Sequence, residues 1–330
     1  MSQEREILFL SEHDVRSLIT MKEAIEVVEQ AFKDYALGKA QQLMRRYLTI
    51  EKYKGKIGFM PAYIDTLNVA GIKIVGAYEE NPKKYGLPRV IATTVLLDPE
   101  TGLPTAIMDG TYLTMVRTGA LGAVAAKYLA RKDSEIAGII GAGVQGMGQL
   151  LGLIEVLNIK RVLVYDIVPE NADKFVREVK KMGLDAIRVE SAEAVVKNVD
   201  VLATATTSEK PVVMKDWAKP GLHINSVGVS TAGKQEIDTE LFKISKLVVD
   251  DFDQTSKIGG INVPISQGIL TKNDVYCEIG DLILGRKPGR ISKDEITIFV
   301  TSGLAIQDVS VSQLVYWKAK KMNMGVKVKL

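Results

Sequence analysis

The fold of this chain is decided by the stretch Ile136-Ala137-Gly138-Ile139-Ile140-Gly141-Ala142-Gly143-Val144-Gln145-Gly146. A short apolar run leads into a GxGxxG string, and the residues from Met147 to Leu157 then follow a helical pattern. The next apolar run, Arg161 to Tyr165, ends in Asp166, twenty residues beyond Gly146. A strand, a glycine-rich turn, a helix and a second strand with an acidic end predict a dinucleotide-binding unit.

Each part of this motif has a physical task. Gly141 makes the tight turn, Gly143 lets a pyrophosphate approach the backbone, and Gly146 packs the helix against the strand. The helix N-terminus offers unpaired N–H groups and the positive end of a dipole to the anion. Asp166 can accept hydrogen bonds from the ribose hydroxyls and repels a 2′-phosphate, so the motif favours NAD(H) and leaves NADP(H) open.

Short apolar runs separated by helical patterns continue after the motif. This alternation predicts an α/β fold with a doubly wound parallel sheet covered on both faces. The runs are 136–140, 161–165, 200–205, 224–227 and 247–249.

The N-terminal third of the chain has a different texture. Residues 45–110 contain β-rich runs separated by turn signals, which predict an antiparallel or mixed sheet. A helix is expected over residues 20–35, where Thr20 and Glu23 form a capping box, and another over residues 301–320. The 330 residues suit two domains of roughly 150 residues each, and we expect the last helix to return to the first domain.

Composition excludes several classes of function. The chain has 43 basic and 40 acidic residues, a net charge of +3, so it offers no strong field to a nucleic acid. One cysteine, Cys277, allows no internal disulfide and no zinc cluster, which suits a cytoplasmic protein without a metal. We expect no signal peptide and no membrane helix. His13 is expected at the surface and His223 as a hydrogen-bonded residue of the core or of a site edge, so we expect proton chemistry to come from other groups.

Seven segments together resemble the ornithine cyclodeaminase/mu-crystallin family over nearly the whole chain. The resemblance implies a Rossmann domain, residues 117–300, inserted into a second α+β domain for substrate binding and dimerisation, residues 1–116 and 301–330. It also implies a homodimer that transfers a hydride at an α-carbon bearing nitrogen and a carboxylate. The segments are 58–63, 71–75, 108–110, 116–120, 141–146, 220–228 and 301–308.

The resemblance also assigns residues to the substrate. Arg45 and Lys73 fall where the family binds the substrate carboxylate, with Met60 and Ser302 as further substrate contacts. Lys73 is independently conspicuous, because a single lysine between Ile72 and Ile74 in an apolar strand is poorly explained as a solvated side chain. Arg45 and Arg46 cannot both face one pocket, because adjacent strand residues point in opposite directions, and the sequence leaves that choice open.

The remaining assignments concern the dinucleotide and the catalytic groups. Lys73 and Ser230 are expected to be catalytic, and Arg117 to contact the dinucleotide phosphates. The cofactor-binding residues implied by the resemblance are Arg117, Thr118, Gly141, Gly143, Val144, Gln145, Asp166, Thr206, Val227, Gly228, Ser230, Lys234 and Thr301.

Three departures from the family pattern narrow the chemistry. The cyclodeaminases and alanine dehydrogenases of the family carry an aspartate where this chain has Ser230, and the cyclodeaminases carry a glutamate where it has Gly58. A serine does not replace a carboxylate as a general base without an activating partner, whereas it can donate a hydrogen bond to an imine. Arg89 also differs from the family, and either a phosphate contact or solvation would explain it.

The substitutions at positions 230 and 58 resemble the ketimine-reducing branch of the family. We therefore expect NADH-dependent reduction of a small cyclic imino acid, Δ1-pyrroline-2-carboxylate to L-proline, with NADPH and the larger Δ1-piperideine-2-carboxylate left open. The alternatives are an alanine dehydrogenase, an ornithine cyclodeaminase, and a non-catalytic protein that binds NAD(P)H or a small ligand. Ring size is beyond the sequence, because one methylene changes binding by only about 1–3 kcal/mol.

Overall fold

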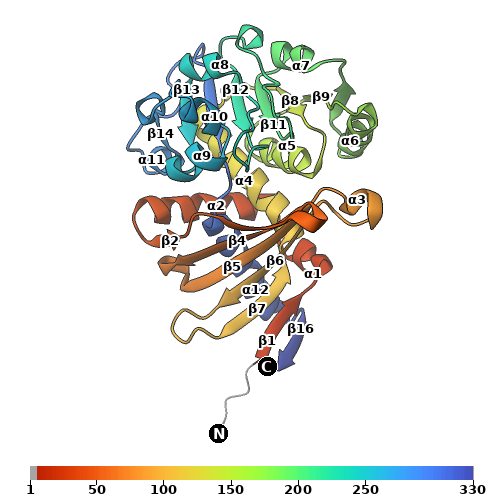
Figure 1. The fold of residues 1–330 in the computed structure, drawn as a ribbon, viewed down its shortest axis with the longest axis vertical. Helices are drawn as coiled ribbons and strands as arrows, with labels where there is room; N and C mark the ends of the chain where they lie inside the picture. The colour runs from red at the N-terminus through yellow and green to blue at the C-terminus, as the bar shows by residue number, and fades with distance from the viewer. Residues whose placement is uncertain (1–5, 330) are drawn as a thin grey trace. The chain divides into compact units, whose positions relative to one another are not determined.

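The computed structural model describes residues 6–329, which form two compact units. Unit 1 contains the chain up to Arg117 and again from Leu304, and unit 2 contains Thr118–Gly303. The chain passes from one unit to the other inside helix α4 (Thr111–Leu129) and again between Gly303 and Leu304. Figure 1 shows the elements of both units.

Unit 1 is built on a mixed sheet, which confirms the sheet predicted for residues 45–110. Among its described residues, eight strands lie in the order β16-β1-β7-β6-β5-β4-β2, with β3 paired to β4. The β1 and β7 strands run parallel and the other neighbours run antiparallel. The strands are β1 (Glu6–Leu10), β2 (Ala40–Gln42), β3 (Arg46–Ile50), β4 (Gly55–Ile64), β5 (Val69–Tyr78), β6 (Val90–Leu97), β7 (Pro104–Asp109) and β16 (Val326–Lys329).

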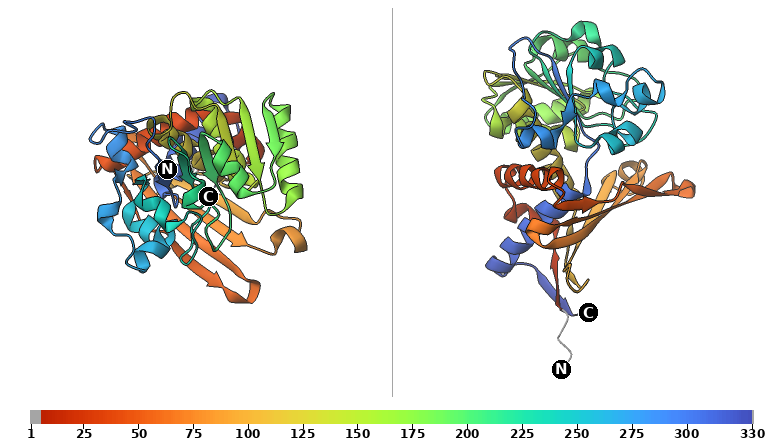
Figure 2. Two further views of the ribbon diagram at one scale, coloured as in Figure 1. Left: turned by 90° about the horizontal axis from the view of Figure 1, so that it is seen from above. Right: turned by 90° about the vertical axis from the view of Figure 1, so that its left-hand side faces the viewer.

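Helix α12 (Ala305–Met322) packs against β4, β5 and β6 of this sheet and also against α2 (Met21–Ala36), as Figures 1 and 2 show. The Thr20 hydroxyl oxygen accepts a hydrogen bond from the Glu23 N–H, and the Glu23 carboxylate accepts one from the Thr20 N–H, so the predicted capping box is confirmed. The other helices of this unit are α1 (Glu12–Leu18) and α3 (Asn81–Lys84).

Unit 2 confirms the predicted Rossmann fold. Within residues 118–303, eight strands form a parallel sheet in the order β10-β9-β8-β11-β12-β15-β13-β14. The order reverses direction between β8 and β11, so this is the switch point at which such sheets bind ligands. The strands are β8 (Ile136–Ile140), β9 (Arg161–Tyr165), β10 (Asp185–Arg188), β11 (Val201–Thr204), β12 (His223–Ser226), β13 (Lys246–Val249), β14 (Cys277–Glu278) and β15 (Thr297–Val300).

Helices and apolar cores cover both faces of this parallel sheet. One core includes Leu150, Phe175 and Val162, and another includes Val195, Leu241 and Ile224. Doubly wound sheets need such cover on both faces. The helices are α5 (Val144–Val156), α6 (Pro169–Lys181), α7 (Ala192–Asn198), α8 (Thr239–Lys243), α9 (Phe252–Ile258), α10 (Asn262–Ser266) and α11 (Ile279–Ile283).

Two predicted helix boundaries were wrong. α5 begins at Val144 rather than Met147, because the last three residues of the GxGxxG string already form its first turn. α12 begins at Ala305 rather than residue 301, because Gly303 has φ +78° and Leu304 is extended. No helix in the part of the chain from residue 6 to residue 329 is both long and apolar enough to span a membrane.

Candidate functional site

Lys73 is a buried cation of unit 1. Its side chain is 1% exposed, and its position on β5 lies opposite Met60 of β4 and Thr94 of β6. Residues opposite one another in a sheet share a face, so these three side chains lie together. A Cβ added to Gly71, on the same face of β5, would come within 3.2 Å of Val309, so α12 covers this face.

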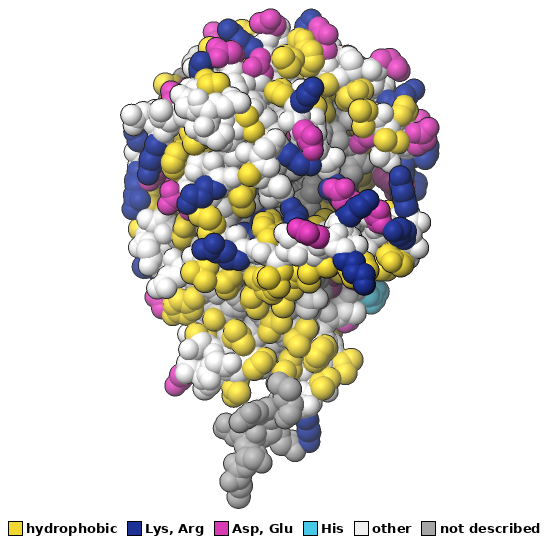
Figure 3. Space-filling view, viewed as in Figure 1, with side chains coloured by type: hydrophobic (Ala, Val, Ile, Leu, Met, Phe, Trp, Pro, Cys, Tyr) yellow, Lys and Arg dark blue, Asp and Glu magenta, His cyan; other side chains and the backbone are white. Residues whose placement is uncertain are grey.

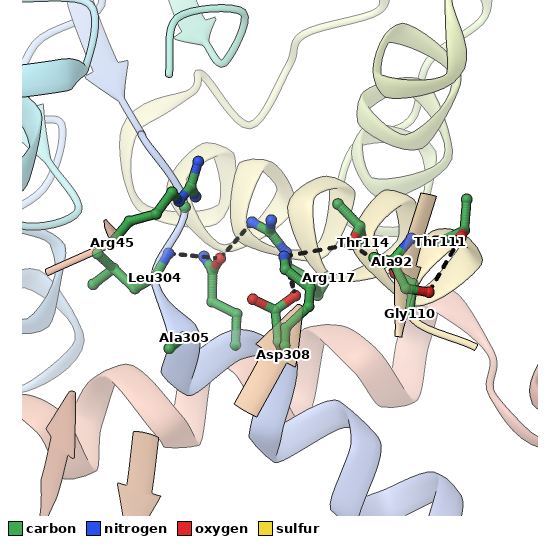
Figure 4. A network of polar contacts seen from close by, with 12 residues as sticks. Arg45, Ala92, Gly110, Thr111, Thr114, Arg117, Leu304, Ala305 and Asp308 are labelled. Carbon is green, nitrogen blue, oxygen red and sulfur yellow. Dashed lines mark hydrogen bonds and ion pairs between the residues drawn. The ribbon is translucent and has the colours of Figure 1, made fainter. Parts of the chain in front are cut away.

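Asp308, on the first turn of α12, connects Lys73 to Arg117. Its Oδ1 lies 2.7 Å from Lys73 Nζ and 3.0 Å from Arg117 Nε. Figure 4 shows Arg117 of α4 and Asp308 of α12 pointing toward one another. Asp308 is 1% exposed and Arg117 is 5% exposed, so bulk water screens neither charge effectively.

Polar neighbours hold this cluster in place. Arg117 donates from Nη1 to Gln307 Oε1 at 2.7 Å, and the Leu304 N–H donates to the same oxygen at 3.2 Å. Lys73 Nζ lies 3.4 Å from Thr114 Oγ1, whose hydroxyl donates to the Gly110 carbonyl at 2.6 Å. The charges are therefore fixed by side chains from a strand and two helices.

The cluster changes the acidity of its members. Burial lowers the pKa of Lys73 to about 7, the Arg117 charge adds to this effect, and the Asp308 charge opposes it. Burial alone would raise the pKa of Asp308, but the charges of Arg117 and Lys73 outweigh it and hold that pKa below its ordinary value. Lys73 therefore exchanges a proton near neutral pH, whereas Asp308 stays ionised.

Arg45 and Arg46 differ in exposure and in their distance from the Lys73 cluster. Arg45 is partly buried, donates to the Tyr47 hydroxyl at 3.0 Å, and lies close enough to lower the pKa values of Lys73 and Asp308. Arg46 is exposed at the start of β3. Arg45 is therefore the member of the pair that belongs to the cluster.

In unit 2, the glycine loop has the backbone that the sequence predicts. Gly141 has φ +96°, and a Cβ on it would lie 2.6 Å from the Ala205 carbonyl oxygen, so a larger residue would be strained. A Cβ on Gly146 would lie 2.3 Å from the Gly141 carbonyl oxygen and 3.0 Å from Ile139 of β8, which confirms its predicted packing task.

The same loop fits a dinucleotide phosphate. Gly143 caps α5 without a side-chain hydrogen bond, and a Cβ on it would meet nothing within 4 Å, so the space over the loop is open. Val144 is exposed, and the buried Oε1 of Gln145 has no hydrogen-bond partner among residues 6–329. Unpaired N–H groups at a helix N-terminus beside open space suit an anion.

Asp166, at the end of β9, braces the glycine loop. Its Oδ2 accepts from the Ala142 N–H at 2.8 Å, and its Oδ1 accepts from the Val168 N–H at 2.9 Å. A carboxylate has further lone pairs for ribose hydroxyls. The next residue, Ile167, is 86% exposed and carries no charge for a 2′-phosphate.

Glu236 joins the two loops that follow β11 and β12. It accepts from the Thr206 N–H and hydroxyl at 2.7 and 2.8 Å, and from the Gly228 N–H at 2.9 Å. The Thr204 and Ser226 hydroxyls also donate to it, at 2.9 and 3.2 Å. Burial raises the pKa of Glu236, and these donors oppose that rise.

Asp250 likewise holds the loop that follows β15. Its carboxylate accepts from the Thr301 hydroxyl at 2.6 Å and from the Ser302 and Gly303 N–H groups at 2.9 and 3.0 Å. The Ser302 hydroxyl accepts from Gln254 Nε2 at 2.9 Å. Ser302, expected to contact the substrate, lies in unit 2.

The other predicted residues of unit 2 also lie near the carboxyl ends of strands. Thr206 follows β11, Val227, Gly228 and half-buried Ser230 follow β12, and Thr301 follows β15. Lys234 donates to the Thr207 carbonyl at 3.3 Å, in the loop after β11. Thr118 lies in α4, where its carbonyl accepts from Gln149.

The structure also shows the surroundings of the two histidines and of Arg89. His223 is fully buried between Thr297 and Asn225, and burial lowers its pKa to about 3, so the prediction of a core histidine is confirmed. His13 is exposed, as predicted. Arg89 forms an exposed ion pair with Glu79 at 3.2 Å.

Arg117 is the predicted cofactor residue that lies in unit 1. Its assignment to the dinucleotide phosphates stays a prediction, whereas its bonds to Asp308 and Gln307 belong to the Lys73 cluster. Sequence reasoning gave no role to Asp308, Glu236 or Asp250. The acidic Asp308 among apolar positions of a helix was a usable signal, whereas the two others lie in loops without a periodic pattern.

Known proteins are similar to this chain over nearly its whole length. Residues 5–323 match the family model described as the ornithine cyclodeaminase/mu-crystallin family. The chain is 48% identical over 324 residues to an alanine dehydrogenase of Archaeoglobus fulgidus, covering 98% of each chain.

Two solved structures are also similar. A Δ1-pyrroline-2-carboxylate reductase of Thermococcus litoralis, solved with NADH and L-proline, is 45% identical with a TM-score of 0.95, over 98% of this chain and 100% of that one. An archaeal alanine dehydrogenase dimer with bound NAD is 47% identical with a TM-score of 0.94, over 98% and 99% of the two chains.

Proposed function

Because the chain belongs to the ornithine cyclodeaminase/mu-crystallin family, we propose that it reduces the cyclic ketimine Δ1-pyrroline-2-carboxylate to L-proline with NADH. The chain is an NAD(P)H-dependent oxidoreductase that acts on CH–NH groups. The proposal concerns its substrate and the residues that act on it. The observation that carries it is the buried cluster of Lys73, Arg117, Asp308 and Arg45 in unit 1.

This cluster supports binding of one carboxylate. Lys73 and Arg117 both contact Asp308, and Arg45 lies close enough to act electrostatically on it. Arginine and ammonium groups both form strong charge-assisted bonds to a carboxylate. We assign the substrate carboxylate to these cations, with Met60 as an apolar neighbour of Lys73.

Lys73 is also the proposed proton donor. When bound, NADH supplies a hydride to the α-carbon, and the ring nitrogen must then take a proton. The pKa of Lys73 is about 7, which places its proton exchange near the pH at which general acids work best. Ser230 is the proposed hydrogen-bond donor to the imine side.

The dinucleotide is assigned to the loops of unit 2. Gly141, Gly143, Val144 and Gln145 would hold the pyrophosphate, and Asp166 the adenosine ribose. The side chains of Asp166 and uncharged Ile167 support NADH over NADPH. Glu236 would keep the loops carrying Thr206 and Gly228 in register with the glycine loop.

A second candidate is an alanine dehydrogenase, which the Archaeoglobus fulgidus relative favours. Reductive amination of pyruvate requires ammonia addition and water loss before hydride transfer. Those steps need more acid–base chemistry than reduction of a preformed imine. Position 230 carries a serine and no carboxylate, which supports the cyclic ketimine.

We also propose that two copies associate through the uncovered face of the unit 1 sheet. Ile74, Ile91 and Leu48 are 37%, 39% and 56% exposed there, beside a hollow of about 570 Å³. Figure 3 shows hydrophobic side chains gathered over the strands of this unit. The archaeal alanine dehydrogenase is a dimer, and Ile91→Asp should give a monomer by light scattering if this face pairs.

A cytoplasmic location is part of the same proposal. Cys277, the single cysteine, is 8% exposed, and burial raises its pKa to about 12. A neutral, buried thiol suits a reducing compartment.

The experiment that tests the function is an NADH-oxidation assay with Δ1-pyrroline-2-carboxylate, Δ1-piperideine-2-carboxylate, and pyruvate plus ammonia. We expect the highest kcat/KM with the five-membered imine. A higher value with pyruvate plus ammonia would support the alanine dehydrogenase instead. NADH binding without turnover of any of the three would contradict both.

A further inference from the structure

The carboxylate of Asp308 uses only one of its two oxygens within the protein. Oδ1 receives both Lys73 Nζ at 2.7 Å and Arg117 Nε at 3.0 Å. Oδ2 is buried and has no hydrogen-bond partner among residues 6–329. A buried acceptor without a donor is destabilising, so it is uncommon in a native protein without a functional reason.

The neighbouring Gln307 side chain also has one hydrogen-bonded atom and one atom without a partner among the described residues. Gln307 Oε1 accepts from Arg117 and from the Leu304 N–H, which fixes the orientation of the amide. Its Nε2 is buried and has no partner in the part of the chain that the structure describes. One acceptor and one donor on adjacent residues of α12 are thus available to a polar ligand.

We infer that Asp308 Oδ2 accepts a hydrogen bond from the protonated nitrogen of an α-imino or α-amino acid whose carboxylate is held by Lys73 and Arg117. This inference rests on the proposed function, which places a carboxylate at these cations. In such a ligand, nitrogen and carboxylate are attached to the same carbon. A ligand whose carboxylate binds the two cations bonded to Oδ1 therefore carries its nitrogen one carbon away from that carboxylate, and we assign this nitrogen to the unpartnered Oδ2.

The charge pattern fits a ligand that carries both signs. Lys73 and Arg117 contact Asp308 Oδ1, and the pKa of Asp308 is held below its ordinary value, so Asp308 is ionised near neutral pH. A zwitterionic ligand presents its negative group to the cations and its positive N–H to Asp308. A simple carboxylate satisfies the cations and leaves Oδ2 without a donor.

Asp308 would thereby supply the negative charge that Ser230 does not carry. The nitrogen of a cyclic ketimine becomes positive before or after it receives the hydride, and a fixed carboxylate stabilises that charge in a buried site. Asp308 then determines specificity for nitrogen-bearing substrates over plain carboxylic acids. A residue that only positioned Lys73 and Arg117 would affect both kinds of ligand equally.

Matched ligands separate these two roles. L-Proline and cyclopentanecarboxylate share the ring and carboxylate and differ in the N–H. Their affinities for the full-length protein with NADH would be measured by calorimetry for the wild type, for Asp308→Asn, and for Asp34→Asn. Asp34 is a control because it is another buried carboxylate of unit 1, bonded to the neutral side chains of Gln30 and Thr66.

We expect wild type and Asp34→Asn to prefer L-proline by about thirtyfold, the size of a buried hydrogen bond to a charged group. Asp308→Asn should lose at least about tenfold of that preference, while its affinity for cyclopentanecarboxylate changes less than about threefold. An equal loss for both ligands would overturn the inference, because it would show that Asp308 only positions the cations.

Two further measurements keep the test decisive. If Asp308→Asn fails to fold, the wild type must still bind L-proline far more tightly than tetrahydro-2-furoate, whose ring oxygen cannot donate to Oδ2. Equal binding of these two ligands overturns the inference.

The pair L-alanine and propionate tests the nitrogen contact independently of the proposed cyclic substrate. If only that pair shows the Asp308 effect, the cyclic substrate is wrong and the nitrogen contact stands. No preference for nitrogen in either pair overturns the contact.

Discussion

Asp308 in unit 1 and Glu236 in unit 2 are both fully buried carboxylates, but their surroundings differ. Asp308 is bonded to two cations through one oxygen, and its other oxygen has no partner among the described residues. Glu236 accepts from neutral hydroxyl and N–H donors on both oxygens. The first arrangement leaves one carboxylate oxygen for a ligand that donates a hydrogen bond, and the second leaves none.

The two carboxylates therefore suit different tasks. Asp308 suits ligand binding, and Glu236 suits support of the loops that donate to it. A fully satisfied buried carboxylate fixes the segments that donate to it. A buried carboxylate with one unused oxygen is more stable with a ligand that donates to that oxygen than without one. We therefore place the reacting groups around Lys73 and Asp308, and assign to Glu236 the task of holding the dinucleotide loops.

Replacing Lys73 by alanine should give the largest effect. The substitution removes a carboxylate contact and the proposed proton donor, so kcat/KM for the cyclic ketimine should fall by about a thousandfold. NADH affinity, measured by fluorescence titration, should stay within about twofold, because the glycine loop and Asp166, to which we assign the dinucleotide, lie in unit 2. Lys83→Ala, at an exposed position of unit 1, is the control. An activity within about tenfold of wild type would remove Lys73 from the mechanism.

The Arg45→Ala and Arg46→Ala pair should show the next largest effect. Arg45 lies in the cluster and Arg46 is exposed. Loss of one charge-assisted contact should raise KM by about thirtyfold for Arg45→Ala, whereas Arg46→Ala should stay within about twofold. Steady-state kinetics check this, and the reverse ranking would mean that the other arginine faces the substrate.

Glu236→Gln should weaken the supporting site. The amide group replaces one acceptor oxygen by a donor, so donors such as the Gly228 N–H lose their partner. We expect the free energy of unfolding to fall by about 2–3 kcal/mol in urea titrations, and NADH affinity to fall by about tenfold. Glu190→Gln, on the surface, should change neither quantity. Unchanged NADH affinity in a destabilised variant would confine Glu236 to a purely structural task.

The smallest expected effect is a pH dependence of carboxylate binding. Lys73 has a pKa of about 7, so it is charged below that pH and becomes neutral above it. The affinity for cyclopentanecarboxylate should therefore fall by about fivefold between pH 6 and pH 9, measured by calorimetry with NADH present. Lys73→Met should flatten this profile. A wild-type affinity that rises with pH would show that the sign assigned to Lys73 is wrong.

Much of unit 2 could be predicted because its signals are local. The GxGxxG string, the flanking apolar runs and Asp166 lie within 31 consecutive residues, and each has a geometric reason. The start of α5 was misplaced because glycines inside its first turn have poor helix propensity.

Unit 1 could be predicted less completely because its contacts join distant segments. Lys73 was conspicuous as a single charge in an apolar strand, but its partner Asp308 lies 235 residues further along the chain. No spacing rule connects two such positions. The choice between Arg45 and Arg46 likewise depended on where β3 begins, and strand ends are set by pairing across the sheet.

The most direct test of the central claim follows the hydride. The protein would be incubated with Δ1-pyrroline-2-carboxylate and NADH carrying deuterium at both C4 positions of the nicotinamide ring, with Lys73→Ala in parallel. The account predicts L-proline with one deuterium at its α-carbon, formed by wild type and almost absent with Lys73→Ala. Proline without deuterium, or equal labelling by both proteins, would contradict it.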